Sequence, residues 1–183
     1  MMHGSPFGDF AVAWSDAPGG PSVRRVLLPQ RDMVRAVGEA FPEAELGTSA
    51  QVASLASRIR ALLGGSDVSF SLDEVSLESC GEFQQRVLRA EHAIPRGSVS
   101  TYGGIANHIG VPGGARAVGR ALATNPFPVV VPCHRAIRSD GGLGGYQGGV
   151  AMKRALLQFE GVEVSPSGRV VAPRLHYETG APA

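Results

Sequence analysis

A chain of 183 residues with 43% hydrophobic content can bury the core of one domain or of two small ones. No apolar run approaches the roughly 18 residues of a membrane span, and no basic region followed by an apolar one opens the sequence, so we expect neither a membrane segment nor a secretion signal. Cys80 and Cys133 lack the spacing of a metal site, and we therefore expect free thiols in a cytoplasmic protein, or in a nuclear one if the source is eukaryotic.

The formal net charge of +1 is unevenly distributed along the chain. Residues 1–81 carry a formal charge of −4, whereas residues 82–183 carry +5. A polyanion, if one binds, is therefore expected to contact the second half of the chain. Ordinary variation in a solvated surface explains the asymmetry equally well, so charge alone does not decide between the two interpretations.

The first part of the chain predicts a small α/β unit. Apolar and β-branched runs predict three strands, over residues 9–14, 23–28 and 68–72. The first two are joined by the turn-rich segment 15–22, which is the pattern of a hairpin. Together with two helices, these strands are expected to form an N-terminal α/β domain that spans residues 1–79.

Two helices are predicted within this first domain. Helical periodicity places them over residues 31–41 and 49–65. Thr48 or Ser49 is the expected cap of the second helix, and Gly64 is its expected end.

The second part of the chain is predicted to be mainly helical and to span residues 80–183. Helical periodicity predicts four helices, over residues 81–94, 99–110, 113–125 and 148–161. The second of these is expected to be capped by Ser100. Two short helices joined by a glycine-containing turn have the outline of a helix-turn-helix, although helix hairpins more often pack a protein core. The predicted fold class is α/β (α+β), in which a small N-terminal α/β domain precedes a mainly helical, winged-helix-like domain.

The helix predicted over residues 113–125 carries almost no large side chains. One long cation, Arg116, projects from a surface of glycine and alanine. Small residues serve tight helix–helix packing, and they equally suit a helix laid into the minor groove of DNA, whose width of about 6 Å excludes bulky side chains. In the second interpretation Arg116 enters the duplex, and the degenerate pattern of the minor groove gives little sequence preference.

Cys133 lies where a buried strand is expected to open into a flexible loop. Residues 129–131 are three consecutive valines bounded by Pro128 and Pro132, a pattern that predicts a short strand. A cysteine that acts as a nucleophile must ionise, so its pKa must fall below the ordinary value of about 8.5 for reaction at neutral pH.

His134 is the nearest candidate for the base that takes the proton of Cys133. Neighbouring side chains on an extended strand point to opposite faces, so the two groups require either a turn at Pro132–Cys133 or a bridging water. The other ring nitrogen needs a carboxylate, and Glu160 is the attractive candidate because an anion in the last turn of a helix needs a compensating donor. A simply exposed Glu160 fits the pattern equally well.

The run "NPFPVVVPCHRAIRSDGGLGGYQGGVAMKRALLQFEG" resembles the active-site segment of the 6-O-alkylguanine-DNA alkyltransferases, also called methylated-DNA–protein-cysteine methyltransferases. The similarity extends upstream through "FQQRVLRAEHAIPRGSVSTYGGIANHIGVPGGARAVGRALATNP" and covers roughly residues 82–162. Pro-Cys-His-Arg at this spacing to Asn-Pro, Gly-Gly-Tyr and Glu-Gly is highly specific for that family. Residues 1–80 are compatible with the family's N-terminal α/β domain only in outline.

The resemblance implies catalytic roles for five matching residues. Cys133 is the expected alkyl acceptor, with His134 linked to it through a water and Glu160 fixing His134. Asn125 is expected to join the recognition helix to the active-site strand. Tyr102 is expected to crowd the phosphate beside the target and to hydrogen-bond the flipped base.

The resemblance also implies contacts with DNA and with the damaged base. The residues expected to contact DNA are Thr101, Ala115, Arg116, Gly119 and Arg135. Arg116 is expected to fill the gap that the flipped nucleotide leaves in the stack. The residues expected to line the guanine pocket are Ala136, Gly144, Tyr146 and Gln147.

The implied activity is DNA repair by direct reversal. An alkyl group moves from 6-O-alkylguanine, and by extension from 4-O-methylthymine, to Cys133, and the protein is consumed in the reaction. The expected partner is double-stranded DNA, bound through its minor groove by a monomer. No metal or other cofactor and no membrane are expected to take part.

Three other interpretations remain open from the residues. An alkyltransferase-like protein binds the lesion without repairing it, but such proteins lack the acceptor cysteine. A winged-helix regulator with a structural cysteine leaves the Pro-Cys-His-Arg motif and Glu160 unexplained. A cysteine hydrolase would take its base from far along the chain, and neither His92 nor His108 belongs to a supporting pattern. Lys153 is expected to lie in solvent.

Overall fold

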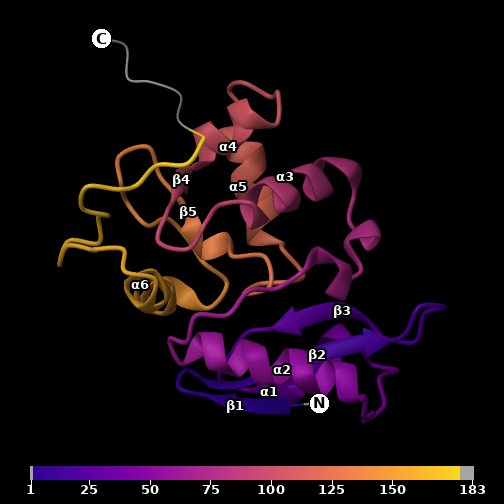
Figure 1. Ribbon diagram of the computed structural model, residues 1–183. Coiled ribbons are helices and arrows are strands. Elements are labelled where there is room, and N and C mark those ends of the chain that lie inside the picture. Colours follow the sequence, from indigo (N-terminus) through magenta and orange to yellow (C-terminus); the bar gives the residue numbers. More distant parts are fainter. Residues whose placement is uncertain (1, 178–183) are drawn as a thin grey trace. The chain divides into compact units, whose positions relative to one another are not determined.

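The computed structural model describes residues 2–177, and its fold is mixed α/β, as the sequence predicts (Figure 1). The chain divides into two compact units. The first contains the residues up to Ser79 together with Pro126–Val130, and the second contains Cys80–Asn125 and the described residues from Val131 onward. The sequence predicts a single boundary between residues 79 and 80, and it does not predict that Pro126–Val130 groups with the first unit.

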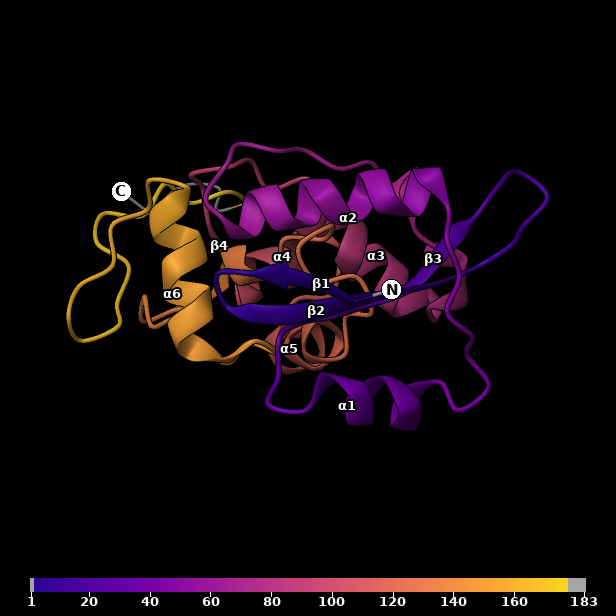
Figure 2. The same ribbon diagram turned by 90° about the horizontal axis from the view of Figure 1, so that it is seen from below.

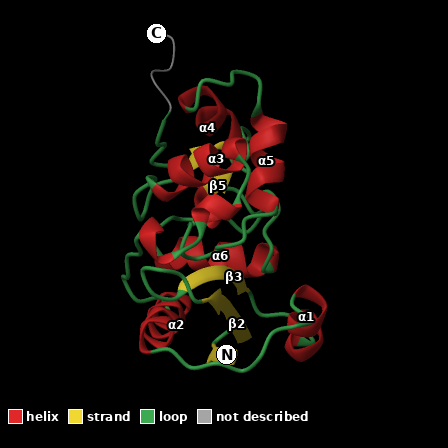
Figure 3. Cartoon of the chain, turned by 90° about the vertical axis from the view of Figure 1, so that its right-hand side faces the viewer, coloured by secondary structure: helices red, strands yellow, loops and turns green. Residues whose placement is uncertain are grey.

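The first unit is built on an antiparallel sheet with the strand order β1-β2-β3. Its elements are β1 (Met2–Ser5), β2 (Gly8–Ser15), β3 (Ser22–Leu27), α1 (Met33–Ala40), α2 (Ala50–Leu63) and the 3₁₀ helices η1 (Leu72–Glu74) and η2 (Leu77–Ser79). The helices α1 and α2 lie on opposite sides of β1 and β2 (Figure 2, Figure 3). Phe10 of β2 and Ile59 of α2 are fully buried, so the sheet and α2 share one core.

The predicted hairpin is confirmed as β2 and β3, in which Val12 lies opposite Val26. β1 pairs with the other edge of β2, and its sequence MHGS has no alternating pattern that would have predicted it. The strand predicted over residues 68–72 is wrong, because Ser71 begins η1. The Ser71 side chain and the Glu74 carboxylate each accept a backbone N–H there, and such local bonds compete with an extended conformation.

Both helices of the first unit lie where the periodicity predicts them. Of the two candidate caps of α2, Ser49 serves, because its hydroxyl oxygen accepts the backbone N–H of Val52 at 3.4 Å. Gly64 ends the helix as predicted. The capping pattern was therefore readable from the local sequence.

The second unit surrounds the cysteine segment with helices. Its elements are α3 (Glu82–His92), β4 (Ser100–Thr101), α4 (Tyr102–His108), α5 (Ala115–Ala123), η3 (Cys133–Arg135), β5 (Ala136–Ile137) and α6 (Gly149–Phe159). β4 and β5 form a parallel pair, with Ser100 opposite Ala136. η3 packs against both α3 and α6. The cysteine segment is therefore interior to this unit.

The predicted helix pair is formed by α4 and α5, which pack against each other. Thr101, rather than the predicted Ser100, caps α4, because its Oγ1 accepts the backbone N–H of Gly104 at 2.9 Å. Gly114 begins α5, and a Cβ there would lie only 2.8 Å from the carbonyl oxygen of Val111. Only glycine therefore fits the tight turn before α5.

The strand predicted over residues 129–131 is wrong. These residues are buried, but they lie in a turn, and Val129 has a φ of +77°, which an extended strand excludes. Cys133 opens η3 instead of following a strand, and its backbone N–H donates to the carbonyl of Val131 at 2.8 Å. A short apolar run predicts burial, but periodicity cannot assign its backbone conformation.

None of the helices within residues 2–177 combines the length and the hydrophobicity needed to cross a bilayer. α2 has 14 residues, whereas a membrane span requires about 20.

Candidate active site

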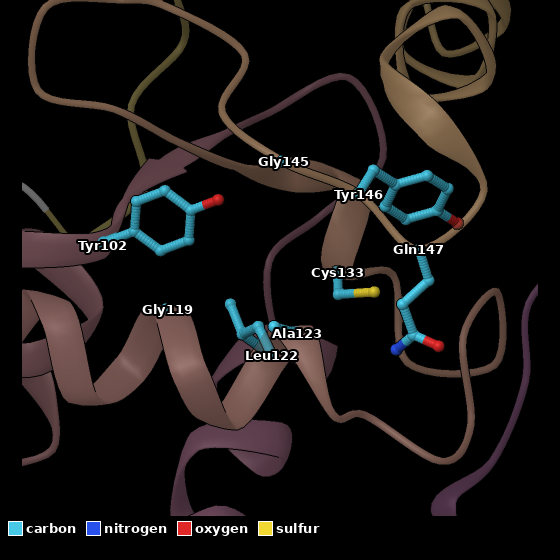
Figure 4. Close-up of a pocket in the computed structure, with 8 residues that line it drawn as sticks. All are labelled: Tyr102, Gly119, Leu122, Ala123, Cys133, Gly145, Tyr146 and Gln147. Carbon is cyan, nitrogen blue, oxygen red and sulfur yellow. The ribbon is translucent and has the colours of Figure 1, made fainter.

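A cavity of about 400 Å³ in the second unit has Cys133 in its wall (Figure 4). The residues that line it are Tyr102, Gly119, Leu122, Ala123, Cys133, Gly145, Tyr146 and Gln147. They come from the start of α4, from α5, from η3 and from the loop before α6. Figure 4 shows Tyr102 and Tyr146 on opposite sides of the cavity, with Cys133 between them.

The thiol of Cys133 is only 5% exposed. Burial raises its pKa to about 12, and a hydrogen bond with Asn125 offsets only part of this effect. The expectation of a lowered pKa is therefore wrong for the resting protein, because the sequence does not show how completely the sulfur is removed from water. The thiol is protonated at neutral pH, and its reaction requires an acceptor for the proton.

A buried carboxylate lies beside the neighbouring histidine. Nε2 of His134 lies 2.8 Å from Oε1 of Glu160, and both side chains are almost completely inaccessible. Burial alone would raise the pKa of Glu160, but hydrogen bonds from His134 and Arg135 outweigh it and lower the pKa to about 2. Burial lowers the pKa of His134, and Glu160 opposes this effect. The pair is therefore a carboxylate and a neutral imidazole.

This pairing fixes the tautomer of His134. A carboxylate only accepts hydrogen bonds, so Nε2 must carry the proton and Nδ1 must carry the lone pair. Nδ1 is buried and has no hydrogen-bond partner among the described residues. His134 therefore offers one unused basic nitrogen in the residue adjacent to Cys133.

Arg135 completes this network instead of reaching toward solvent. Its Nε and Nη2 donate to the two oxygens of Glu160 at 2.9 and 2.8 Å, and its Nη1 donates to the carbonyl of Ile94 at 2.6 Å. The structure gives no support to the expected contact between Arg135 and DNA, because the buried guanidinium is already engaged on both edges. Its charge is needed to hold Glu160 ionised in the interior.

Asn125 and Gln147 connect the segments on either side of the cysteine. The backbone N–H of Asn125 donates to Leu122 at the end of α5, and its side-chain amide donates to the carbonyl of Val131 at 3.3 Å. The side chain of Gln147 donates to the carbonyl of Asn125 at 2.8 Å. The end of α5, the cysteine segment and the loop before α6 are thus joined at one residue.

Tyr102 is the first residue of α4 and faces the cavity. Burial raises the pKa of its hydroxyl to about 12, and the nearby Glu91 and Cys133 add to the shift. The hydroxyl therefore remains a hydrogen-bond donor. A Cβ at Gly144 would lie 2.9 Å from this hydroxyl oxygen. A larger residue at position 144 would therefore collide with Tyr102.

Two of the expected pocket residues do not line the cavity themselves. A side chain at Gly144 would collide with the Tyr102 side chain, and Ala136 is completely buried at the start of β5. Tyr146 and Gln147 do line it. The ring of Tyr146 meets that of His134 edge-on at 6.3 Å, so the pocket wall is in contact with the histidine network.

Lys153 is a site residue that the sequence interpretation placed wrongly in solvent. Its side chain is completely buried, and Nζ donates to the carbonyl of Ala136 at 2.5 Å and lies 5.9 Å from the centre of the Tyr102 ring. Burial lowers its pKa to about 8. The signal was available, because Lys153 precedes the buried Leu156 and Leu157 by three and four residues on the apolar face of α6.

Three of the five residues expected to contact DNA lie on α5. Arg116 is exposed, whereas Ala115 and Gly119 are half-buried. Gly119 also lines the cavity, so the cavity rim and the small-residue face belong to the same helix. Thr101 is largely buried, and its hydroxyl oxygen caps α4.

Comparison with known proteins agrees with this geometry. The model of the "6-O-methylguanine DNA methyltransferase, DNA binding domain" family matches residues 82–162. The methylated-DNA–protein-cysteine methyltransferase of Methanothermobacter thermautotrophicus is 40% identical over 164 residues, which are 90% of this chain and 85% of the relative. The protein of the same name from Mycobacterium leprae is 38% identical over 83% of this chain and 93% of its own length.

The structural comparison covers both units. A crystal structure of Mycobacterium tuberculosis OGT in complex with DNA superposes with a TM-score of 0.67 and 33% sequence identity, over 87% of this chain and 90% of that one. Sequence and fold thus agree over almost the whole length. The chain belongs to the methylated-DNA–protein-cysteine methyltransferase family.

Proposed function

We propose that this protein repairs alkylated DNA by transferring the alkyl group of 6-O-alkylguanine to the sulfur of Cys133. One observation carries the assignment of the acceptor: Cys133 lies in the wall of a cavity, and the adjacent His134 holds a free lone pair on Nδ1. The Glu160 carboxylate fixes the tautomer that leaves this lone pair available. A structural cysteine would need none of these features.

The proton of Cys133 passes to His134 as the sulfur reacts. A water between the thiol and Nδ1 completes the path, since buried polar groups without a protein partner commonly bind one. The imidazolium that forms is stabilised by Glu160, as the carboxylate stabilises the histidine of a catalytic triad. The resting pKa of about 12 means that the thiolate forms only during the reaction.

The transfer step balances within the site. The sulfur attacks the alkyl carbon and forms the C–S bond while the C–O bond breaks, and the electron pair of that bond stays on the guanine oxygen. The hydroxyl of Tyr102 donates a hydrogen bond to the leaving guanine and is the proposed source of its proton. Tyr102 regains a proton from His134, so no proton is gained or lost overall. The thioether on Cys133 has no good leaving group, and the protein therefore acts once.

The small-residue face of α5 fits the minor groove of double-stranded DNA. The target nucleotide must be extruded to reach Cys133, at a cost of a few kcal/mol. Arg116 is exposed one turn before Gly119 on the cavity rim, and it fills the vacancy in the stack. We expect a monomer that acts with little sequence preference, and action in the cytoplasm, by analogy with its bacterial and archaeal relatives.

Mass spectrometry of the protein after incubation with a duplex that contains 6-O-methylguanine tests this proposal. One methyl group should appear on the peptide that contains Cys133, in a stoichiometry of one per protein. Cys133→Ser should abolish the transfer, whereas Cys80→Ser, which removes the other buried thiol, should not. Binding of the lesion without methylation of the wild-type protein would instead support the alkyltransferase-like alternative, which the presence of Cys133 disfavours.

A further inference from the structure

The chain beyond α6 is bonded to two segments that lead directly into the active-site cavity, residues 141–143 and residues 99–100. We call residues 165–177 the C-terminal strap; they lie outside the segment that matches the family's DNA-binding domain. The strap contains no helix and no strand of its own, and it runs close to α4, β4 and the loop before α6 (Figure 1). Its hydrogen bonds connect it to the loop before α6, to β4 and to α3.

The first part of the strap is bonded to the loop that leads to the cavity. The backbone N–H of Val170 donates to the carbonyl of Gly141 at 2.9 Å, and that of Leu143 donates to the carbonyl of Gly168 at 3.3 Å. The next residues along this loop are Gly144, where a Cβ would collide with the Tyr102 hydroxyl, and Gly145, which lines the cavity. The strap therefore fixes this loop immediately before it reaches the pocket.

The second part of the strap is bonded to the edge of β4. The N–H of Val99 donates to the carbonyl of Arg174 at 3.0 Å, and the N–H of His176 donates to the carbonyl of Val99 at 2.8 Å. The hydroxyl of Ser100 donates to the carbonyl of His176 at 2.7 Å. The strap thus forms an isolated parallel bridge, Val99 with Leu175, immediately before β4, which itself pairs with β5.

Tyr177 ends the described strap and joins two helices. Its hydroxyl donates to the carbonyl of Ala90 on α3 at 2.9 Å. Its ring stacks on that of His108, the last residue of α4, with a centroid distance of 3.7 Å and an angle of 17°. One side chain therefore fixes the end of α4 opposite to the end that carries Tyr102.

We propose that the C-terminal strap positions Tyr102 and the pocket loop for alkyl transfer, with Tyr177 as its main positioning residue. The reason is the shortness of the elements involved: β4 has two residues and α4 has seven, too few for either to be rigid alone. Tyr102 follows β4 directly, so any movement of that strand moves its hydroxyl. A misplacement of about 1 Å can reduce a rate by about 100-fold. The inference rests on the proposed function of Cys133.

Four variants separate positioning from simple stabilisation. Tyr177→Ala removes both contacts of the ring and the hydroxyl, whereas Tyr177→Phe keeps the stacking on His108. A chain that ends after Ala172 lacks the bridge to Val99 and the contacts of Tyr177. A chain that ends after Tyr177 keeps every contact described above and is the matched control.

The main measurement is the single-turnover rate of methyl transfer at saturating methylated duplex, at a temperature well below unfolding for every variant. We expect Tyr177→Ala to reduce the rate about tenfold and Tyr177→Phe to reduce it about threefold, with affinity for undamaged duplex unchanged within twofold. The chain that ends after Ala172 should be slower still, and the control should match the full-length protein. Wild-type rates in Tyr177→Ala, with only a lower melting temperature, would show a purely stabilising role and overturn the proposal.

Hydrogen exchange tests the strap without reference to chemistry. Amides of residues 99–104 should exchange faster in the chain that ends after Ala172 than in the control, whereas those of residues 141–143, whose bonds to Gly168 and Val170 are retained, should exchange at the same rate. Unchanged exchange of residues 99–104 would also overturn the proposal. If the truncated chain does not fold, the comparison of Tyr177→Ala with Tyr177→Phe still decides. Absence of methyl transfer in the full-length protein would reject the proposed function instead, and the exchange result would still report on the strap.

Discussion

Glu160 is the residue on which the chemistry of the site converges. It lies at the end of α6, where the helix macrodipole disfavours an anion, yet His134 and Arg135 keep it ionised in the interior. The sequence left an exposed and a functional Glu160 equally open. The structure decides for the buried, paired carboxylate because both partners come from η3, which packs against α6.

Replacement of this carboxylate should damage both stability and transfer. We expect Glu160→Gln to lower the free energy of unfolding by about 3 kcal/mol, because it leaves the Arg135 charge buried without its partner. The transfer rate should fall by ~100-fold or more, because an amide no longer holds the His134 tautomer or stabilises its imidazolium. Chemical denaturation and single-turnover kinetics measure the two effects. Glu163→Gln, at an exposed position nearby, should change neither; equal effects of both substitutions would exclude a specific role for Glu160.

The same carboxylate gives the protein an acid-sensitive component of stability. The pKa of Glu160 is lowered in the folded state from the ordinary 4.5 to about 2. Its contribution is therefore complete above pH 4.5 and is lost as the pH falls from 4.5 toward 2.

Glu91 makes the stability of the fold depend on pH in the opposite direction to Glu160. Its side chain is completely buried on α3. Burial raises its pKa to about 8, against the attraction of Lys153 and Arg135. A raised carboxyl pKa stabilises the fold fully below the unfolded pKa of 4.5, and this stabilisation is lost as the pH rises toward 8.

Glu91→Gln should remove that pH dependence. The neutral amide has the same shape and does not ionise, so the free energy of unfolding should fall less between pH 5 and pH 9 than in the wild-type protein. Denaturation curves across this range measure the difference. Glu82→Gln, on the exposed start of the same helix, should retain the wild-type slope. An identical slope in Glu91→Gln would contradict the assignment.

At the scale of elements, the helix caps show which features can be predicted from the neighbouring sequence alone. Ser49 caps α2 as the sequence predicts, because a cap bonds only to the next turn of its own helix. Ser100 does not cap α4, because its hydroxyl donates to the carbonyl of His176 in the strap, and Thr101 caps the helix instead. The prediction was wrong by one residue for a tertiary reason.

Thr101 should therefore affect both α4 and the reaction. We expect Thr101→Ala to lower the free energy of unfolding by about 1 kcal/mol, because the N–H of Gly104 loses its acceptor. Transfer should slow at the same time, since Tyr102 is the next residue. Thr101→Ser keeps the capping oxygen and should recover most of both losses, as measured by denaturation and single-turnover rates. Equal losses in the two variants would show that the methyl group, and not the cap, matters.

At the scale of the whole molecule, the charge asymmetry of the sequence fits a DNA-binding second half. The boundary between an N-terminal domain over residues 1–79 and a C-terminal domain over residues 80–183 stays a proposal. The grouping of Pro126–Val130 with the first unit is a tertiary property, because that segment follows Asn125 directly in the second.

The role proposed for Arg116 can be tested separately from the chemistry of alkyl transfer. We expect Arg116→Ala to slow methyl transfer from duplex DNA about tenfold, which corresponds to about 1.4 kcal/mol of lost support for the extruded nucleotide. The rate with free 6-O-benzylguanine, which needs no extrusion, should not change. Arg31→Ala removes the same charge from an exposed position in the first unit and should affect neither substrate. A proportional loss with both substrates would place Arg116 in the chemical step.

The sequence by itself determined the family, the α/β class, the helices and the candidate pair Cys133–His134, because motif spacing, periodicity and capping are local properties. It could not determine the protonation of Cys133, the burial of Lys153 or the engagement of Arg135. Those depend on contacts among α3, η3, β5 and α6, which come from separate parts of the chain. Solvent exclusion and charge pairing are properties of packed surfaces, and only the tertiary structure brings these surfaces together.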